Sequence, residues 1–217
     1  MQDKTRKKGS IVKRIIFLSI ILFILFLLQK ALHRPSFDPD TVAKAETSMW
    51  KAYYKRDKKA LGVELIKLQR NQFGLNLYNA VFIARDLGKA AMKFRDARSN
   101  HEKNVLPDLI SAYSRIQKKS GYDFDPKEAA RAELAWWVAR RSNVQNNPEV
   151  VGAKIAHLYE ILYGKSSPHF YKAGRFRAQA AAMRDQGGES ADWLAVENML
   201  KESYRELSKA VPESPIR

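Results

Sequence analysis

Hydrophobic positions follow helical spacing over most of the chain. Val151, Ile155, Leu158 and Leu162 are separated by four, three and four residues, which places them on one face of a helix. The same spacing continues over the segment from Trp193 to Val211. No segment of strand length alternates between apolar and polar residues as a half-buried strand would. The pattern therefore predicts an all-α domain.

Proline and glycine residues mark the predicted helix ends. A capping side chain followed by proline is typical of a helix start, and a glycine is typical of a helix end. Predicted starts are Asp38-Pro39, Leu106-Pro107, Asp125-Pro126, Asn147-Pro148, Ser167-Pro168 and Ser190, and predicted stops are Gly121, Gly164 and Gly187. Together these marks predict helices at about 39–56, 58–72, 75–98, 107–119, 126–142, 148–163, 168–186 and 190–210.

The predicted helices are joined by short connections. Short connections favour antiparallel neighbours, and the later helix starts recur roughly every 20 residues. About 7–8 helices arranged in this way form either a closed antiparallel bundle or a stacked array of α-hairpins. Both architectures remain open at this point.

An apolar segment precedes this helical body. Ile15 to Leu28 carries no charge, and Ser19 is its only polar residue. A helix over residues 11–32 would reach about 33 Å, enough to span a bilayer core of about 30 Å, although it would include three basic residues near its ends. A cleaved signal peptide and a soluble core helix are the alternatives. We favour an uncleaved transmembrane anchor, because no small-residue cleavage site follows in residues 29–36.

The charges beside this segment predict an orientation. Six Lys or Arg residues lie between Lys4 and Arg14, and fewer basic residues follow the segment. We therefore expect a single-pass membrane protein with a cytoplasmic N-terminus and a helical domain on the exterior side, which is the periplasm for a bacterial inner membrane. The predicted organisation is a basic cytoplasmic tail 1–14, an anchor 11–32, a linker 33–39, an all-helical domain 40–211 and a tail 212–217.

The whole chain is strongly basic, with 39 Lys and Arg against 23 Asp and Glu, a formal charge of +16 and no cysteine. Such a balance favours acidic partners. Five basic residues interleaved with two tyrosines form a candidate contact for an anionic surface such as lipid headgroups: Lys51, Lys55, Arg56, Lys58 and Lys59. A solvated helix face is the alternative interpretation. The predicted exterior location disfavours nucleic acid as the partner.

One motif is rich in tryptophan and arginine: RAELAWWVARR, from Arg131 to Arg141. On a helix, Trp136 points about 100° away from Trp137, so the two indoles cannot face one narrow seam. Either this helix is central and buried on two sides, which we favour, or Trp136 is an exposed anchor for a partner. The candidate interaction residues are Trp136, Trp137, Arg140, Arg141, Tyr159 and Tyr163.

Familiar catalytic and metal-binding motifs do not occur in the sequence. It contains no Glu-x-x-His, His-Glu-x-x-His, Gly-x-Ser-x-Gly or glycine-rich phosphate loop, so we assign no catalytic, cofactor or metal residue. We expect a membrane-anchored, non-catalytic helical module that docks a protein or assembly of the membrane or envelope. A cell-envelope enzyme without a recognisable motif is the alternative. A pocket with buried carboxylates of raised pKa would favour the enzyme, and an exposed aromatic face would favour the docking module.

Overall fold

The computed structural model describes residues 2–142 and 146–211, with side chains from residue 16 onward. Throughout this part of the chain the regular structure is helical, with ten α-helices, one 3₁₀ turn and no strand, which confirms the all-α prediction. The helices are α1 (Gln2–Leu32), α2 (Pro39–Tyr54), α3 (Lys58–Phe73), α4 (Leu77–Asp96), α5 (His101–Asn104), α6 (Leu106–Ser120), α7 (Pro126–Arg141), α8 (Pro148–Tyr163), α9 (Pro168–Gly187) and α10 (Trp193–Ser208).

The helix boundaries follow the capping residues. Asp38, Asp125, Asn147 and Ser167 each accept a hydrogen bond from a backbone amide in the first turn of α2, α7, α8 and α9, as predicted. The last predicted start was wrong. Gly188–Ser190 forms the 3₁₀ turn η1, and Asp192 caps α10 by accepting hydrogen bonds from Leu194 N and Ala195 N.

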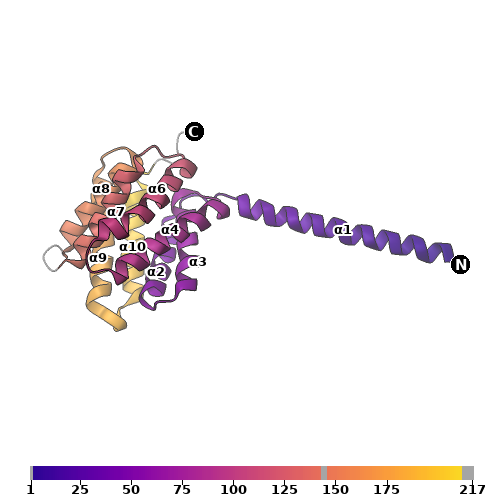
Figure 1. The fold of residues 1–217 in the computed structure, drawn as a ribbon, viewed down its shortest axis with the longest axis horizontal. Helices are drawn as coiled ribbons and strands as arrows, with labels where there is room; N and C mark the ends of the chain where they lie inside the picture. Colours follow the sequence, from indigo (N-terminus) through magenta and orange to yellow (C-terminus); the bar gives the residue numbers. More distant parts are fainter. Residues whose placement is uncertain (1, 143–145, 212–217) are drawn as a thin grey trace.

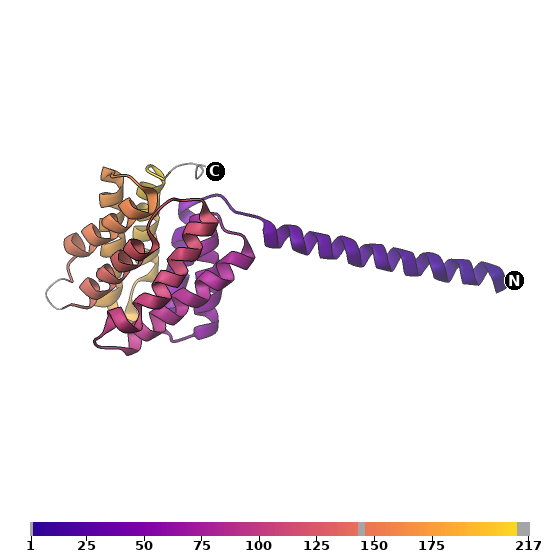
Figure 2. The same ribbon diagram turned by 45° about the horizontal axis from the view of Figure 1, so that its top comes forward.

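Eight of these helices form a closed antiparallel ring (Figures 1 and 2). In the order α2, α3, α4, α6, α7, α8, α9 and α10, each helix packs against its neighbours in the sequence, and α10 packs against α2. The contact between α10 and α2 identifies the architecture as a closed bundle, because in an open array of α-hairpins these two helices would lie apart. None of the described helices occupies its centre, so the inward-facing side chains surround a common space.

The tightest helix crossing of the ring lies between α8 and α9. A Cβ atom added to Gly174 would lie 2.3 Å from the carbonyl oxygen of Gly152, and one added to Gly152 would lie 2.8 Å from the Cα of Arg175. Both distances are far below an ordinary carbon contact of about 3.5–4.0 Å. The two glycines therefore allow the backbones of α8 and α9 to touch, which sets the diameter of this side of the ring.

Helix α1 extends away from the ring (Figure 1), and its large apolar side chains from Ile16 to Leu28 are exposed. Across the described residues no helix is long and apolar enough to cross a membrane, so the predicted single-pass membrane protein, with its anchor at 11–32, is contradicted. The strictly apolar run reaches only about 21 Å, and the wider span depended on including charged residues. The side chains of the predicted basic tail 1–14, and the predicted tail 212–217, lie outside the described part.

Candidate functional site: an aromatic cavity inside the helix ring

A cavity of about 550 Å³ lies inside the ring. Seven of the eight ring helices contribute side chains to it, and α10 does not. Its volume is within the range of about 300–1,000 Å³ that is typical of small-molecule sites. Nine aromatic residues line it: Trp50, Tyr53, Tyr54, Phe73, Phe94, Tyr113, Trp136, Trp137 and Tyr159.

Arginine side chains lie over several of these rings. The guanidinium carbon of Arg177 is 5.0 Å from the ring centroid of Trp136, and that of Arg140 is 5.2 Å from Trp50. A guanidinium at this distance is attracted by the electron-rich face of the ring. The aromatic walls are therefore held in place by fixed positive charges.

A buried network of three helices supports the wall behind Arg177. Arg177 of α9 donates from Nε and Nη2 to Oε1 of Glu46 on α2, at 2.9 and 2.6 Å. The hydroxyl of Tyr204 on α10 donates to Oε2 of the same carboxylate at 2.6 Å. Burial, together with the adjacent Glu46 charge, holds the pKa of Tyr204 well above its usual range, so this hydroxyl stays protonated as a donor.

A second buried carboxylate, Glu133 of α7, lines the cavity itself. Its Oε2 accepts a hydrogen bond from the hydroxyl of Tyr113 at 2.9 Å, and its Oε1 accepts one from the indole N–H of Trp137 at 2.8 Å. Burial and the Glu133 charge raise the pKa of Tyr113, which keeps that proton in place. Both oxygens of Glu133 are thus already engaged, as are both oxygens of Glu46.

The mouth of the cavity lies at the C-terminal ends of α2, α4, α7 and α9. Arg140 of α7 binds both carboxylate oxygens of Asp185 on α9 at 3.0 Å, and its Nη2 donates to the hydroxyl of Tyr54 on α2 at 2.7 Å. These three helices are not neighbours in the ring. The side chains of Arg140, Asp185 and Tyr54 therefore connect helices that lie on different sides of the mouth.

Arg141 stabilises another part of the mouth. Its Nη1 donates to the carbonyl oxygens of Phe94 and Ala97 at 2.6 and 2.9 Å, which caps the C-terminal end of α4. Its guanidinium carbon also lies 3.9 Å from the ring centroid of Phe94. This arginine is thus largely committed to structure.

Arg56 and Arg95 are the basic residues of the mouth with the least engaged side chains. Arg56 is exposed and has no ion pair within the described part of the chain. It adopts a left-handed conformation with φ 57°, and it ends α2 at a position where glycine is usual. Arg95 donates from Nε to Asp96 at 2.9 Å, while its Nη1 is buried without a hydrogen-bond partner among the described residues.

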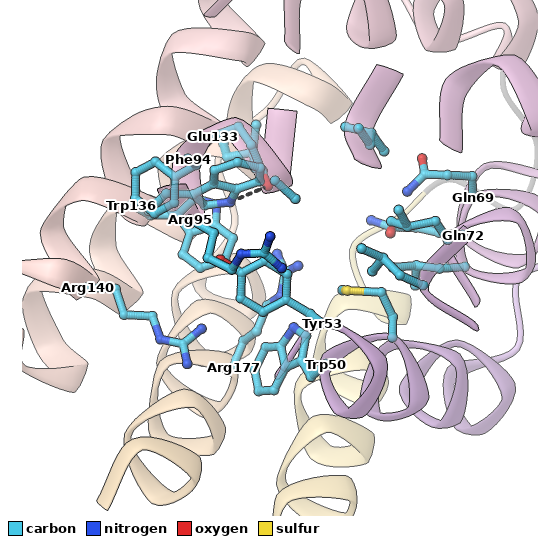
Figure 3. Close-up of a pocket in the computed structure, with 18 of the residues that line it drawn as sticks. Trp50, Tyr53, Gln69, Gln72, Phe94, Arg95, Glu133, Trp136, Arg140 and Arg177 are labelled. Atoms are coloured by element: carbon cyan, nitrogen blue, oxygen red, sulfur yellow. Dashed lines mark hydrogen bonds between the residues drawn. The ribbon is translucent and has the colours of Figure 1, made fainter. Parts of the chain in front are cut away.

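Three polar side chains around the cavity are buried and incompletely paired. Gln69 Oε1, Trp136 Nε1 and the Tyr159 hydroxyl have no hydrogen-bond partner in the described structure, and their residues are 5%, 5% and 0% exposed. Figure 3 shows Gln69 and Gln72 pointing into the cavity from one wall, and Trp136 with Phe94 on the opposite wall. Buried polar atoms in proteins are almost always paired with a protein group, an ordered water or a ligand, so these three atoms are places where the cavity can accept a hydrogen-bonding group.

The structure brings five of the six candidate interaction residues together around this cavity: Trp136, Trp137, Arg140, Arg141 and Tyr159. Tyr163 is buried outside it, against Phe170 and Tyr122. Trp136 is buried. Helix α7, however, belongs to the ring and does not lie at its centre. Both indoles line the cavity and pack edge to face against each other, with ring centroids 6.1 Å apart, so the two do share one space. Their role in binding remains a prediction.

The five candidate residues for an anionic surface do not share one helix face. Lys51 lies near the end of α2 with its ammonium 5.5 Å from the ring centroid of Trp193, Lys55 and Arg56 are in the turn, and Lys58 and Lys59 begin α3. Arg56 alone among these five lines the cavity. The tyrosines between them, Tyr53 and Tyr54, turn inward.

Sequence reasoning missed several residues of the cavity and its support, although a signal was present. Glu46 lies four residues from both Val42 and Trp50, and Gln69 lies four residues from Leu65, so both polar residues interrupt an apolar helix face. A polar residue at such a position is costly unless it is paired. That cost is the reason to expect a partner or a ligand there.

No cluster of three or more metal-ligating side chains occurs among the residues that the structure describes. No family model, curated protein or solved structure matches the chain, so its function must be inferred from the geometry of the site.

Proposed function

We propose that this protein is a non-catalytic helical binding module, and that the cavity inside the ring is its binding site. The observation that carries the proposal is the coincidence of a cavity of about 550 Å³, aromatic walls and three incompletely paired buried polar residues. An apolar cavity with a few convergent polar groups is the usual form of a ligand site.

The buried carboxylates have a positioning role in this proposal. Each oxygen of Glu46 and of Glu133 already accepts a hydrogen bond from a protein side chain. These carboxylates are therefore suited to holding Arg177, Tyr204, Tyr113 and Trp137 in position.

The inward orientation of the aromatic residues also bears on the kind of partner. Trp136 and Tyr159 were candidates for a docking surface, but both are buried against the cavity. A flat protein surface cannot reach them without opening the ring. We therefore propose a small molecule as the ligand, and docking to an envelope protein becomes the less favoured interpretation.

A cavity-filling substitution tests this proposal. Ala91 of α4 lines the cavity, whereas Ala135 of α7 is exposed and outside it. We expect a screen of small molecules by thermal shift to find compounds that stabilise the wild type and the Ala135→Trp control but not Ala91→Trp, with circular dichroism confirming that both variants fold. NMR should recover the bound compounds unchanged. Equal stabilisation of all three proteins, or turnover of a compound, would contradict the proposal.

A further inference from the structure

We infer that the ligand is a planar heteroaromatic ring joined to an anionic group, as in a mononucleotide, with the ring inside the cavity and the anion at its mouth. This inference rests on the proposed function. It is carried by two separate features of the cavity: unpaired polar atoms among aromatic rings in the interior, and under-used arginines at the opening.

The interior discriminates between kinds of apolar ligand. A hydrocarbon chain entering the cavity would displace water and leave Gln69 Oε1, Trp136 Nε1 and the Tyr159 hydroxyl without partners. Leaving buried polar atoms unpaired is unfavourable, so these groups select against a purely apolar ligand. A heteroaromatic ring has donors and acceptors along its edge and flat faces that stack on tryptophan, tyrosine and phenylalanine. It satisfies both the polar atoms and the walls.

The mouth adds a requirement for negative charge. Arg56, Arg95, Arg140, Arg141 and Arg177 line the cavity together with only two acids, Glu133 and Asp185. Asp185 is neutralised by Arg140, and Arg177 is paired with Glu46 behind the wall. Arg56 and the Nη1 group of Arg95 are left to bind a ligand, and guanidinium groups are well suited to phosphate or carboxylate oxygens.

The conformation of Arg56 is consistent with a role in binding. Its φ of 57° is unfavourable for any residue with a side chain, and glycine would fit the same turn with less strain. Strained residues concentrate at functional sites. An arginine at such a position, beside the mouth of a basic cavity, offers a guanidinium contact that glycine cannot make.

Isothermal titration of the full chain with defined probes tests the inference. The probes are AMP, UMP and FMN, which combine a heteroaromatic ring with a phosphate, and sodium laurate and inorganic phosphate, which each supply one part only. We expect at least one of the first three to bind with one molecule per chain, and to bind at least tenfold more tightly than laurate or phosphate. Its affinity should fall as salt is raised, because part of the binding is electrostatic.

Substitutions then assign the two ends of the ligand. Gln69→Leu should weaken the ring-bearing probe about fivefold, since a net hydrogen bond contributes on the order of 1 kcal/mol. Arg95→Gln should weaken it similarly and reduce its salt dependence, while Arg56 keeps part of it. Gln186→Leu and Arg131→Gln are matched controls on the exposed surface outside the cavity, and neither should change the affinity.

The outcomes separate this inference from the proposed function. If laurate binds the wild type but not Ala91→Trp and AMP, UMP and FMN do not bind, or if phosphate alone binds as tightly as they do, the ligand class is wrong while the cavity remains a binding site. If neither the probes nor any compound of the thermal-shift screen binds the wild type, both the ligand class and the binding module are overturned.

Discussion

Glu46 and Arg177 form a buried ion pair between α2 and α9, although 131 positions separate them in the sequence. Arg177 Nη2 lies 2.6 Å from Glu46 Oε1, and the side chain of Arg177 must pass α10, which lies between α9 and α2 in the ring, to reach it. Tyr204 of α10 completes the network by donating to the other carboxylate oxygen. The pair therefore joins the three helices where the ring closes.

Removing one member of this pair is expected to destabilise the fold strongly. Glu46→Ala leaves the Arg177 guanidinium buried without a counter-charge, which costs about 3–5 kcal/mol. Urea denaturation measures the free energy of unfolding. The control is Glu202→Ala, which removes an exposed partner of Arg205 and should change stability little. Similar losses in the two variants would show that the buried pair has no special role.

Removing the hydroxyl group should have different effects on stability at two buried tyrosines. Tyr204→Phe leaves Glu46 Oε2 without its donor and should cost about 1.5–3 kcal/mol, because a hydrogen bond to a charged group is lost. Tyr159→Phe removes a hydroxyl that has no partner in the described part of the chain, so stability should be unchanged or higher. Chemical denaturation of both variants checks this. An equal loss in Tyr159→Phe would show that its hydroxyl is paired.

Substitution by alanine should have opposite effects on stability at two helical glycines. Gly174→Ala places a Cβ 2.3 Å from the Gly152 carbonyl oxygen, and separating α8 from α9 should cost about 1–3 kcal/mol. Gly62 lies within α3 with nothing within 4 Å of an added Cβ, so Gly62→Ala should stabilise by about 0.5–1 kcal/mol. Thermal and urea unfolding measure both effects, and a neutral Gly174→Ala would refute the tight crossing.

Arg56→Gly should increase stability while it weakens ligand binding. Glycine relieves the left-handed strain at φ 57°, for a net gain of about 0.5–1 kcal/mol after its own backbone entropy is counted. The anionic probe that binds the wild type should bind this variant less tightly. Denaturation and titration are measured on the same preparation. Unchanged affinity would show that Arg56 is not part of the binding site.

Stability should fall in alkaline solution because of four buried tyrosines. Burial raises the pKa of Tyr159 to about 12 and also raises the pKa values of Tyr113, Tyr163 and Tyr204. In the unfolded chain these groups titrate near pH 10, so above that pH the unfolded state holds fewer protons than the folded one and the free energy of unfolding decreases. Their full contribution is present below pH 10.

Absorbance near 295 nm during an alkaline titration checks this linkage. The nine tyrosines of the chain should separate into a group that ionises while the protein is folded and a group that ionises only as circular dichroism shows unfolding. Ionisation of all nine in one step near pH 10 with the fold intact would contradict it.

Local chemistry explains why the helices could be predicted from the sequence. Capping needs only a side chain and the backbone amides two or three residues away, so Asp125 and Asn147 are recognisable without tertiary information. The exception, at Ser190, arose because Asp192 offers the same chemistry two residues later. The prediction of a transmembrane helix was wrong for a different reason. Its apolar stretch has only fourteen residues, and it reached the length of a membrane span only when charged positions were included.

Within the candidate site, the sequence singled out residues but not their grouping. Trp136, Trp137, Arg140 and Arg141 were conspicuous within one helix, whereas their neighbours in the cavity come from six other helices. Nothing local to Glu46 identifies Arg177 as its partner. Their meeting depends on ring closure.

The sequence by itself determined an all-helical chain, the helix ends and a basic, aromatic character, because helical period and capping act over a few residues. Tertiary structure alone decided that α10 meets α2, that the aromatic side chains face inward, and that Gln69, Trp136 and Tyr159 share one cavity. Those relationships follow from packing between distant segments, where burial of charge and close backbone approach select one arrangement from several that the helices permit.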